Sequence, residues 1–192
     1  DGIDITKMPE HKRAKYIGRV FQDPMKGTAF DMTIEENLSI AYNKIRKRGL
    51  QAGISKADRE LFQEKLSLLG MGLEDRMKEK VRLLSGGQRQ ALTLFMAVIA
   101  KPKLLLLDEH TAALDPSAAR KVLEQTDYFA KDAKLCTMMI THNMKAALEH
   151  GNRTILMQGG QIKMDIRGRE REEMTVEKLI EKFEIDNDRM LL

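Results

Sequence analysis

Four consecutive leucines, Leu104–Leu107, precede two adjacent acidic residues, Asp108 and Glu109. An uninterrupted apolar run of this length is typical of a strand that is buried on both faces of a parallel sheet. A second apolar segment, 135–140, follows a predicted helix that begins at Asp115-Pro116 and ends near residue 130. Because strand, helix and strand in this order form a right-handed βαβ crossover, we expect an α/β fold with a parallel sheet.

Polar residues follow both predicted strands at the point where each strand ends. Asp108 and Glu109 end the first strand, and Thr141, His142 and Asn143 end the second. In open α/β sheets ligands bind beyond the carboxyl ends of the strands, and buried acids there require a positive group opposite them. Neighbouring side chains on a strand point to opposite faces, so one acid could hold a metal through its water shell while the other orients an attacking water. The alternatives are that the acids only cap a surface turn and that His142 is an ordinary core histidine.

The remaining sequence alternates between strand and helix patterns. Residues 16–21 form a short predicted strand, and residues 87–100 form a helix that is apolar on nearly every face and therefore buried. Between them, apolar periodicity after Thr33 and over 58–69 predicts a charged helical lobe inserted into the main fold. The C-terminal part is predicted to contain a β-hairpin (153–157 and 161–166, turning at Gly159-Gly160) and a last helix from Thr175 through Phe183.

The composition is that of a globular chain with one cysteine. The 192 residues are 42% hydrophobic and 32% charged, with a formal net charge of +4. No apolar run approaches the roughly 20 residues that a membrane span needs. The basic cluster Lys44–Arg48 is interpreted as a solvated helix end, and no nucleic-acid partner is expected, because aromatic residues are not interleaved with it. Cys136 excludes an internal disulfide and favours a reducing compartment, and its apolar neighbours predict a buried, unreactive thiol.

Two glycines at the start of the buried helix indicate a phosphate contact. Ser85-Gly86-Gly87 would present backbone N–H groups at a helix N-terminus, where anions bind readily. A phosphate loop that holds its own nucleotide also carries a lysine directly after a glycine. Here Gln88 follows Gly87, and no glycine of the sequence is followed by lysine. These residues by themselves leave open which phosphate the loop touches and which chain holds it.

Five segments resemble, in the same order, the motifs of ABC-type ATPases. They are Phe21–Pro24 (Q-loop), Leu84–Gln88 (signature), Leu104–Glu109 (Walker B strand and catalytic glutamate), Ala113–Asp115 (D-loop) and Ile140–His142 (switch histidine). The resemblance implies a P-loop-NTPase-like parallel sheet with an inserted helical lobe, a C-terminal β-hairpin and a last helix.

The resemblance also implies roles for single residues, with ATP and Mg²⁺ as the ligands. Asp108 would hold Mg²⁺ largely through water, and Glu109 would polarise the attacking water. Gln22 would sense Mg²⁺ and that water, and would link the site to the helical lobe and a membrane partner. His142 would contact the γ-phosphate, and Asp115 would communicate across a dimer interface.

In this family the signature loop binds ATP in trans, at the site of the other subunit of a head-to-tail dimer. Ser85, Gly86, Gly87 and Gln88 would complete that site. The Walker A loop and the adenine-stacking aromatic residue of the family have no counterpart in this sequence. We therefore expect residues 1–192 to be one N-terminally incomplete ABC ATPase domain, inactive by itself. Its expected parts are a strand and Q-loop entry (1–22), the helical lobe (23–84), the signature, Walker B, D-loop and switch-histidine core (85–150), and the hairpin and helix (151–192).

The favoured function is the ATP-hydrolysing subunit of a membrane transporter. The segments that begin at Leu104 and Thr141 resemble a prokaryotic group of importer ATPases, for which amino-acid-like solutes are expected by association. The implied partners are permease subunits, a second ATPase subunit and a solute-binding protein, at the cytoplasmic face of the cell membrane.

Three alternatives remain open at this point. The first is a soluble ABC ATPase of DNA repair or chromosome structure, which the short spacing of about 60 residues between Q-loop and signature disfavours, because those proteins carry a long coiled coil there. The second is a translation-associated tandem ATPase. The third is a non-catalytic interaction module formed by this chain alone. His110 lies where the family more often has proline, and no chemistry is assigned to it.

Overall fold

The computed structural model describes residues 2–43 and 53–188, with side chains up to residue 182. It contains two compact units, residues 1–140 and 141–192, each of which is described by itself. The basic cluster Lys44–Arg48 lies outside the described residues. No described helix is both long and apolar enough to cross a membrane.

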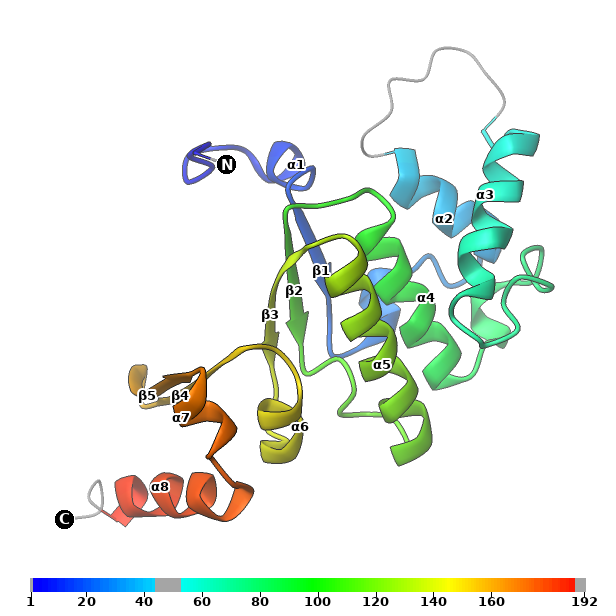
Figure 1. Cartoon of the computed structure of the whole chain (residues 1–192). Helices are drawn as coiled ribbons and strands as arrows, with labels where there is room; N and C mark the ends of the chain where they lie inside the picture. Colours follow the sequence, from blue (N-terminus) through cyan, green and yellow to red (C-terminus); the bar gives the residue numbers. More distant parts are fainter. Residues whose placement is uncertain (1, 44–52, 189–192) are drawn as a thin grey trace. The chain divides into compact units, whose positions relative to one another are not determined.

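The first unit is built around a parallel sheet of three strands (Figure 1). The strands are β1 (Ile17–Val20), β2 (Leu104–Asp108) and β3 (Cys136–Ile140), in the spatial order β1-β2-β3. Val20 pairs with Leu107, and Leu107 pairs with Met139, so the carboxyl ends of all three strands lie at one edge. This arrangement confirms the predicted α/β fold with a parallel sheet.

Two helices, α4 (Gly86–Val98) and α5 (Pro116–Asp132), pack beside each other against the sheet (Figure 1). The rings of Phe95 on α4 and Phe129 on α5 stack with centroids 6.0 Å apart. Leu105 of β2 is fully buried in the resulting core. Burial of this one side chain contributes about 1.5–3 kcal/mol to stability. A Cβ atom at Gly18 of β1 would lie 2.5 Å from the carbonyl oxygen of Ala97, so α4 approaches β1 closely only because residue 18 is glycine.

The other face of the sheet is largely uncovered in the described residues, contrary to expectation. Leu104 and Leu106 of β2 are half-buried, and Cys136, Met138 and Ile140 of β3 are exposed, the latter two by 58% and 56%. The predictions of strands buried on both faces and of a core thiol at Cys136 were therefore wrong. The physical reason is that α4 and α5 cover one face only, so the alternate side chains of β3 point away from the core.

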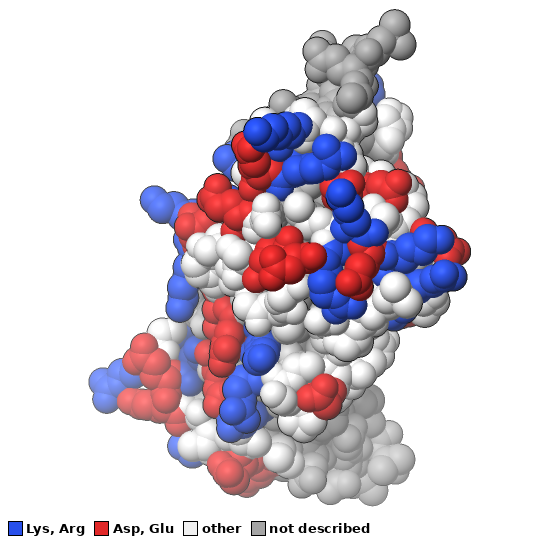
Figure 2. All heavy atoms as spheres, turned by 90° about the vertical axis from the view of Figure 1, so that its right-hand side faces the viewer, with Lys and Arg blue, Asp and Glu red and all other residues white. Residues whose placement is uncertain are grey.

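A helical lobe lies between β1 and α4, as predicted. It contains α2 (Ile34–Asn43) and α3 (Lys56–Ser67), and the short 3-10 helices η1 (Pro24–Gly27) and η2 (Val81–Leu83). Ser55 caps α3 in a reciprocal pair of hydrogen bonds with Asp58. Charges of both signs are interleaved on the face of the molecule that Figure 2 shows, and the lobe contains ion pairs such as Arg59–Glu35, with 2.9 Å between Nε and Oε2.

Short elements complete the description. The helix α1 (Glu10–Arg13) precedes β1. The second unit contains α6 (Met144–Glu149), β4 (Arg153–Gln158), β5 (Gln161–Arg167), α7 (Arg169–Glu172) and α8 (Val176–Asp188). Strands β4 and β5 form the predicted antiparallel hairpin. Its turn residues Gly159 and Gly160 have φ values of 56° and 75°, which only glycine adopts without strain.

Candidate functional site

Three of the predicted site residues lie at the carboxyl edge of the sheet in the first unit. Asp108 is the last residue of β2 and Glu109 follows it, while Gln22 follows the end of β1 by two residues. The register, which pairs Val20 with Leu107, brings these chain segments to the same edge. Asp108 and Glu109 are half-buried and Gln22 is exposed. The acids therefore stand between the core and solvent, where a ligand can reach them.

The backbone of Glu109 has an unusual conformation. Its φ is 45°, in the left-handed region that residues with a side chain seldom adopt. Its N–H donates to the carbonyl oxygen of Ile140 on β3 at 2.9 Å, and its own carbonyl accepts from the N–H of Ala112 at 3.0 Å in a tight turn. Such strain persists only where neighbouring structure holds it, and it is frequent at functional sites. The sheet and the turn thus fix the backbone of Glu109, and with it the direction of its Cα–Cβ bond.

A positive group faces Asp108 at this edge of the sheet. The Nη2 atom of Arg19 on β1 lies 3.3 Å from Oδ2 of Asp108. The side chains of Arg19 and Asp108 are 53% and 42% exposed, so the pair contributes little to stability. The Arg19 guanidinium also lies over the ring of Phe21, 4.5 Å from its centroid. The sequence carried no signal for Arg19, because its proximity to Asp108 follows from strand pairing.

The residues at this edge fit a magnesium ion that a nucleotide helps to bind. Among the described residues, no cluster of three or more His, Cys, Asp or Glu side chains could hold a metal ion without other ligands. Mg²⁺ usually takes one or two protein carboxylates and completes its shell with phosphate oxygens and water. The partly exposed carboxylate of Asp108 and the amide of Gln22 suit that kind of site.

The glycine loop is fixed by the side chain of Gln88. The Ser85 hydroxyl accepts from the N–H of Gln88 at 3.3 Å, and Oε1 of Gln88 accepts from the N–H of Ser85 at 3.2 Å, which is a capping box. The Gln88 amide also donates to the carbonyl of Met71 at 3.1 Å and accepts from Nη1 of Arg76 at 3.2 Å. Gln88 therefore holds the loop in place, while Ser85 and Gly86 remain exposed at the start of α4.

The two glycines of this loop have different surroundings. A Cβ atom at Gly87 would lie 2.8 Å from Cβ of Ala118 on α5, closer than side-chain carbons pack. A Cβ atom at Gly86 would meet only Cδ2 of Leu114, at an ordinary contact distance of 3.6 Å. Packing therefore requires glycine at position 87, whereas the described fold does not require it at position 86.

Asp115 connects the glycine loop to the turn that follows β2. It is the N-cap of α5, as predicted, and its Oδ1 accepts from the N–H groups of Ser117 and Ala118 at 3.1 and 3.0 Å. The preceding residue, Leu114, is the neighbour of Gly86. The predicted D-loop therefore lies against the predicted signature loop within one chain.

His142 belongs to the second unit, so the structure describes it apart from Asp108 and Glu109. It is exposed and follows the end of β3 by two residues. The next residue, Asn143, caps α6 through its Oδ1, which accepts from the N–H of Ala146 at 3.1 Å. The proximity of His142 to the two acids stays a prediction.

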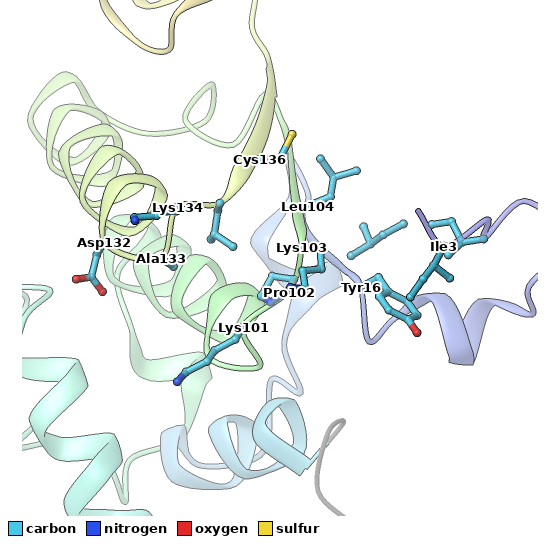
Figure 3. Close-up of a pocket in the computed structure, with 13 residues that line it drawn as sticks. Ile3, Tyr16, Lys101, Pro102, Lys103, Leu104, Asp132, Ala133, Lys134 and Cys136 are labelled. Atoms are coloured by element: carbon cyan, nitrogen blue, oxygen red, sulfur yellow. The ribbon is translucent and has the colours of Figure 1, made fainter. Parts of the chain in front are cut away.

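A cavity of about 780 Å³ lies at the opposite edge of the sheet (Figure 3). Its lining includes Ile17, Leu104 and Cys136, the first residues of the three parallel strands. The candidate acids follow the other ends of these strands, so this cavity is separate from the candidate site.

The chain is similar to ATP-binding proteins of transporters. A family model described as ABC transporter matches residues 1–112. The tyrosine transport ATP-binding protein of Clostridioides difficile (strain R20291) is 44% identical over 184 residues, which cover 96% of this chain and 73% of that protein.

Solved structures with the same fold include an ATP-binding cassette and a part of a transporter complex. The dimeric post-hydrolysis state of the cassette MJ0796, bound to ADP and Pi, is 25% identical, with a TM-score of 0.69 over 87% of this chain and 71% of that chain. The structure of cbiO1 from Clostridium perfringens, part of the transporter complex cbiONQ, is 21% identical, with a TM-score of 0.71 over 98% of this chain and 70% of that chain. The second likeness shows the fold alone.

Proposed function

The chain belongs to the ABC transporter family, and we propose that it is the ATP-binding and ATP-hydrolysing subunit of a membrane transporter. The observation that carries this proposal is the pair Asp108 and Glu109 at the carboxyl edge of the sheet, with the backbone of Glu109 fixed by Ile140. In the loop after this pair, Cδ2 of Leu114 would lie 3.6 Å from a Cβ atom at Gly86, so this loop lies close to the exposed glycine loop. One edge of the unit thus combines acids with backbone donors at a helix start.

The proposed division of work follows from the surroundings of each residue. Glu109, with its backbone fixed, orients and polarises the water that attacks the γ-phosphate. Asp108 and Gln22 hold Mg²⁺, which when bound offsets the charge of the phosphates. His142 donates to the γ-phosphate and stabilises the charge that develops there.

The glycine loop is proposed to act on the nucleotide of a second subunit. Ser85 and the N–H groups of Gly86 and Gly87 contact its phosphates, helped by the dipole of α4. Gln88 contributes by fixing the loop, because its amide is engaged within the chain. Asp115, at the start of α5 beside this loop, communicates with the partner across the head-to-tail interface.

The partners and the substrate class are inferred from the family. We propose an importer of amino-acid-like solutes, because the similar protein from C. difficile is named for tyrosine transport. Its other parts would be a second ATPase subunit, permease subunits and a solute-binding protein. The chain would lie peripherally at the cytoplasmic face of the membrane. Segments 1–22, 23–84, 85–150 and 151–192 would serve as Q-loop entry, helical lobe, catalytic core and C-terminal hairpin with helix.

By themselves, residues 1–192 are proposed to bind ATP–Mg²⁺ very weakly and to hydrolyse none above background. They contain no glycine followed by lysine, so nothing in them cradles the β-phosphate or offsets its charge. Calorimetric titration of this polypeptide with ATP–Mg²⁺ tests the point, and micromolar binding would contradict it.

The decisive test is Glu109→Gln in the complete gene product. We expect turnover to fall roughly 100-fold or more, the scale of a general-base contribution, while ATP binding stays intact. The variant should also accumulate as an ATP-bound dimer, which light scattering detects. Glu124→Gln, at an exposed position on α5, is the matched control and should hydrolyse ATP like the wild type. Near-normal hydrolysis by Glu109→Gln would refute the assignment.

A further inference from the structure

His110 is a buried histidine inside the turn that Glu109 begins. Only 2% of its surface is exposed. The turn is closed by the hydrogen bond from the N–H of Ala112 to the carbonyl of Glu109, at 3.0 Å, so His110 directly follows the strained residue and lies within the same turn. Because one peptide bond joins His110 to Glu109, a displacement of His110 also displaces the backbone of Glu109.

The ring of His110 is tied to helix α5. Its Nε2 lies 3.1 Å from Oγ1 of Thr126, which is 5% exposed. The Thr126 hydroxyl donates its own proton to the carbonyl of Val122 at 2.8 Å, one turn earlier on α5. Because a hydroxyl has only one proton to donate, the contact requires Nε2 of His110 to carry hydrogen and to donate to Thr126. Both groups are buried, so breaking the bond leaves a donor that water cannot easily satisfy.

We propose that the His110–Thr126 hydrogen bond is a positioning device that holds the turn, and with it the Glu109 carboxylate, in the conformation needed for hydrolysis. This inference rests on the proposed ATPase function, because the position of Glu109 affects activity only if Glu109 acts in ATP hydrolysis. His110 is a positioning residue, because it acts through the backbone of Glu109. Helix α5 also carries Ala118 against Gly87, so the same helix supports the catalytic turn and the glycine loop.

A pair of substitutions at Thr126 separates the hydrogen bond from packing. Thr126→Val keeps the shape and removes the acceptor, whereas Thr126→Ser keeps the hydroxyl. In the complete gene product we expect Thr126→Val to lower kcat by roughly 3- to 10-fold, the scale of one hydrogen bond, with an unchanged KM for ATP. Thr126→Ser should restore kcat to near the wild-type value. Combining Thr126→Val with His110→Leu should cost less than the sum of the two single changes, because both remove this hydrogen bond.

Further variants keep the test conclusive. Val98→Ala, in the core of α4, is a control that lowers thermal stability without touching this hydrogen bond and should keep kcat. If Thr126→Val does not fold, the pair His110→Leu and His110→Gln provides the same comparison, since the glutamine amide retains a donor. An unchanged kcat in Thr126→Val, an equal loss in Thr126→Ser, or a loss that Val98→Ala reproduces would overturn the inference.

The wild type and Glu109→Gln, measured in the same assay, separate the two proposals. A wild type without hydrolysis, or an active Glu109→Gln variant, removes the proposed function and the inference with it. An active wild type and an inactive Glu109→Gln, together with a normal kcat in Thr126→Val, leave the proposed function standing and refute the positioning role alone.

Discussion

Gly87 and Ala118 face each other where α4 packs on α5, and a Cβ atom at Gly87 would lie 2.8 Å from that of Ala118. The neighbouring Gly86 has no such constraint within the chain, because its nearest neighbour would be Leu114 at 3.6 Å. Two adjacent glycines in one motif thus have different packing constraints. Gly87 allows two helices to approach each other, and Gly86 leaves room that the described fold does not fill.

The first prediction concerns this packing. Gly87→Ala should destabilise the chain by about 1–3 kcal/mol, because overpacking a close helix contact forces the backbone to shift. Ala118→Gly removes the opposing carbon, so the double variant should lose less than the sum of the two single variants. Urea unfolding measures all three. Gly86→Ala is the matched control and should change the free energy of unfolding by less than about 0.5 kcal/mol. Additive losses in the double variant would contradict the contact.

The second prediction concerns the subunit on which Gly86 acts. Gly86→Asp places a bulky negative side chain where the backbone would approach phosphate, so it should block nucleotide contact at the glycine loop. In mixed dimers that contain one altered subunit, hydrolysis should fail at the site whose phosphate loop belongs to the unaltered partner. Nucleotide trapping resolved by subunit distinguishes the two sites. Damage confined to the altered subunit's own phosphate loop would show that the loop does not act in trans.

The third prediction concerns pH and the support of the glycine loop. Arg76 donates from Nε and Nη2 to Oε2 of Glu79 at 2.9 and 2.7 Å, and these hydrogen bonds hold the pKa of Glu79 below its ordinary value of 4.5. The folded state therefore favours the ionised carboxylate. The contribution of the ionised Glu79 carboxylate to stability is fully present above pH 4.5. It is lost as the pH falls through the lowered pKa that Glu79 has in the folded state.

Unfolding measured across this pH range tests the ion pair. Glu79→Gln should be less stable than the wild type at neutral pH, and the difference should disappear in acid below the lowered pKa of Glu79. Glu124→Gln serves again as the control for removal of an exposed carboxylate. A stability difference for Glu79→Gln that persists unchanged at low pH would mean that the hydrogen bonds with Arg76 do not carry it.

Local chemistry in the sequence was sufficient to place several elements. The pattern of Asp115 before Pro116 located the start of α5, and Gly159-Gly160 located the hairpin turn. These signals are reliable because they depend on backbone conformation within a few residues. The helices α1, α6 and α7 were not predicted, since segments of four to six residues depend on tertiary contacts for their stability.

The same distinction applies to the candidate site. The sequence pointed to Asp108, Glu109 and the glycine loop, because a strand end and a helix start are visible in the local pattern. The order of the motifs then added the resemblance to a family. The sequence did not predict that Arg19 would face Asp108. That pairing depends on which strands are adjacent and in which register.

The sequence by itself determined the α/β class, the strand with its two acids and the N-cap of α5 at Asp115. Only the tertiary structure decided which face of the sheet is covered, and so left Cys136 exposed where a buried thiol was expected. It also joined His110 to Thr126 across 16 residues of chain. Alternation and periodicity specify which side chains share a face, but burial and long-range hydrogen bonds depend on what packs against that face.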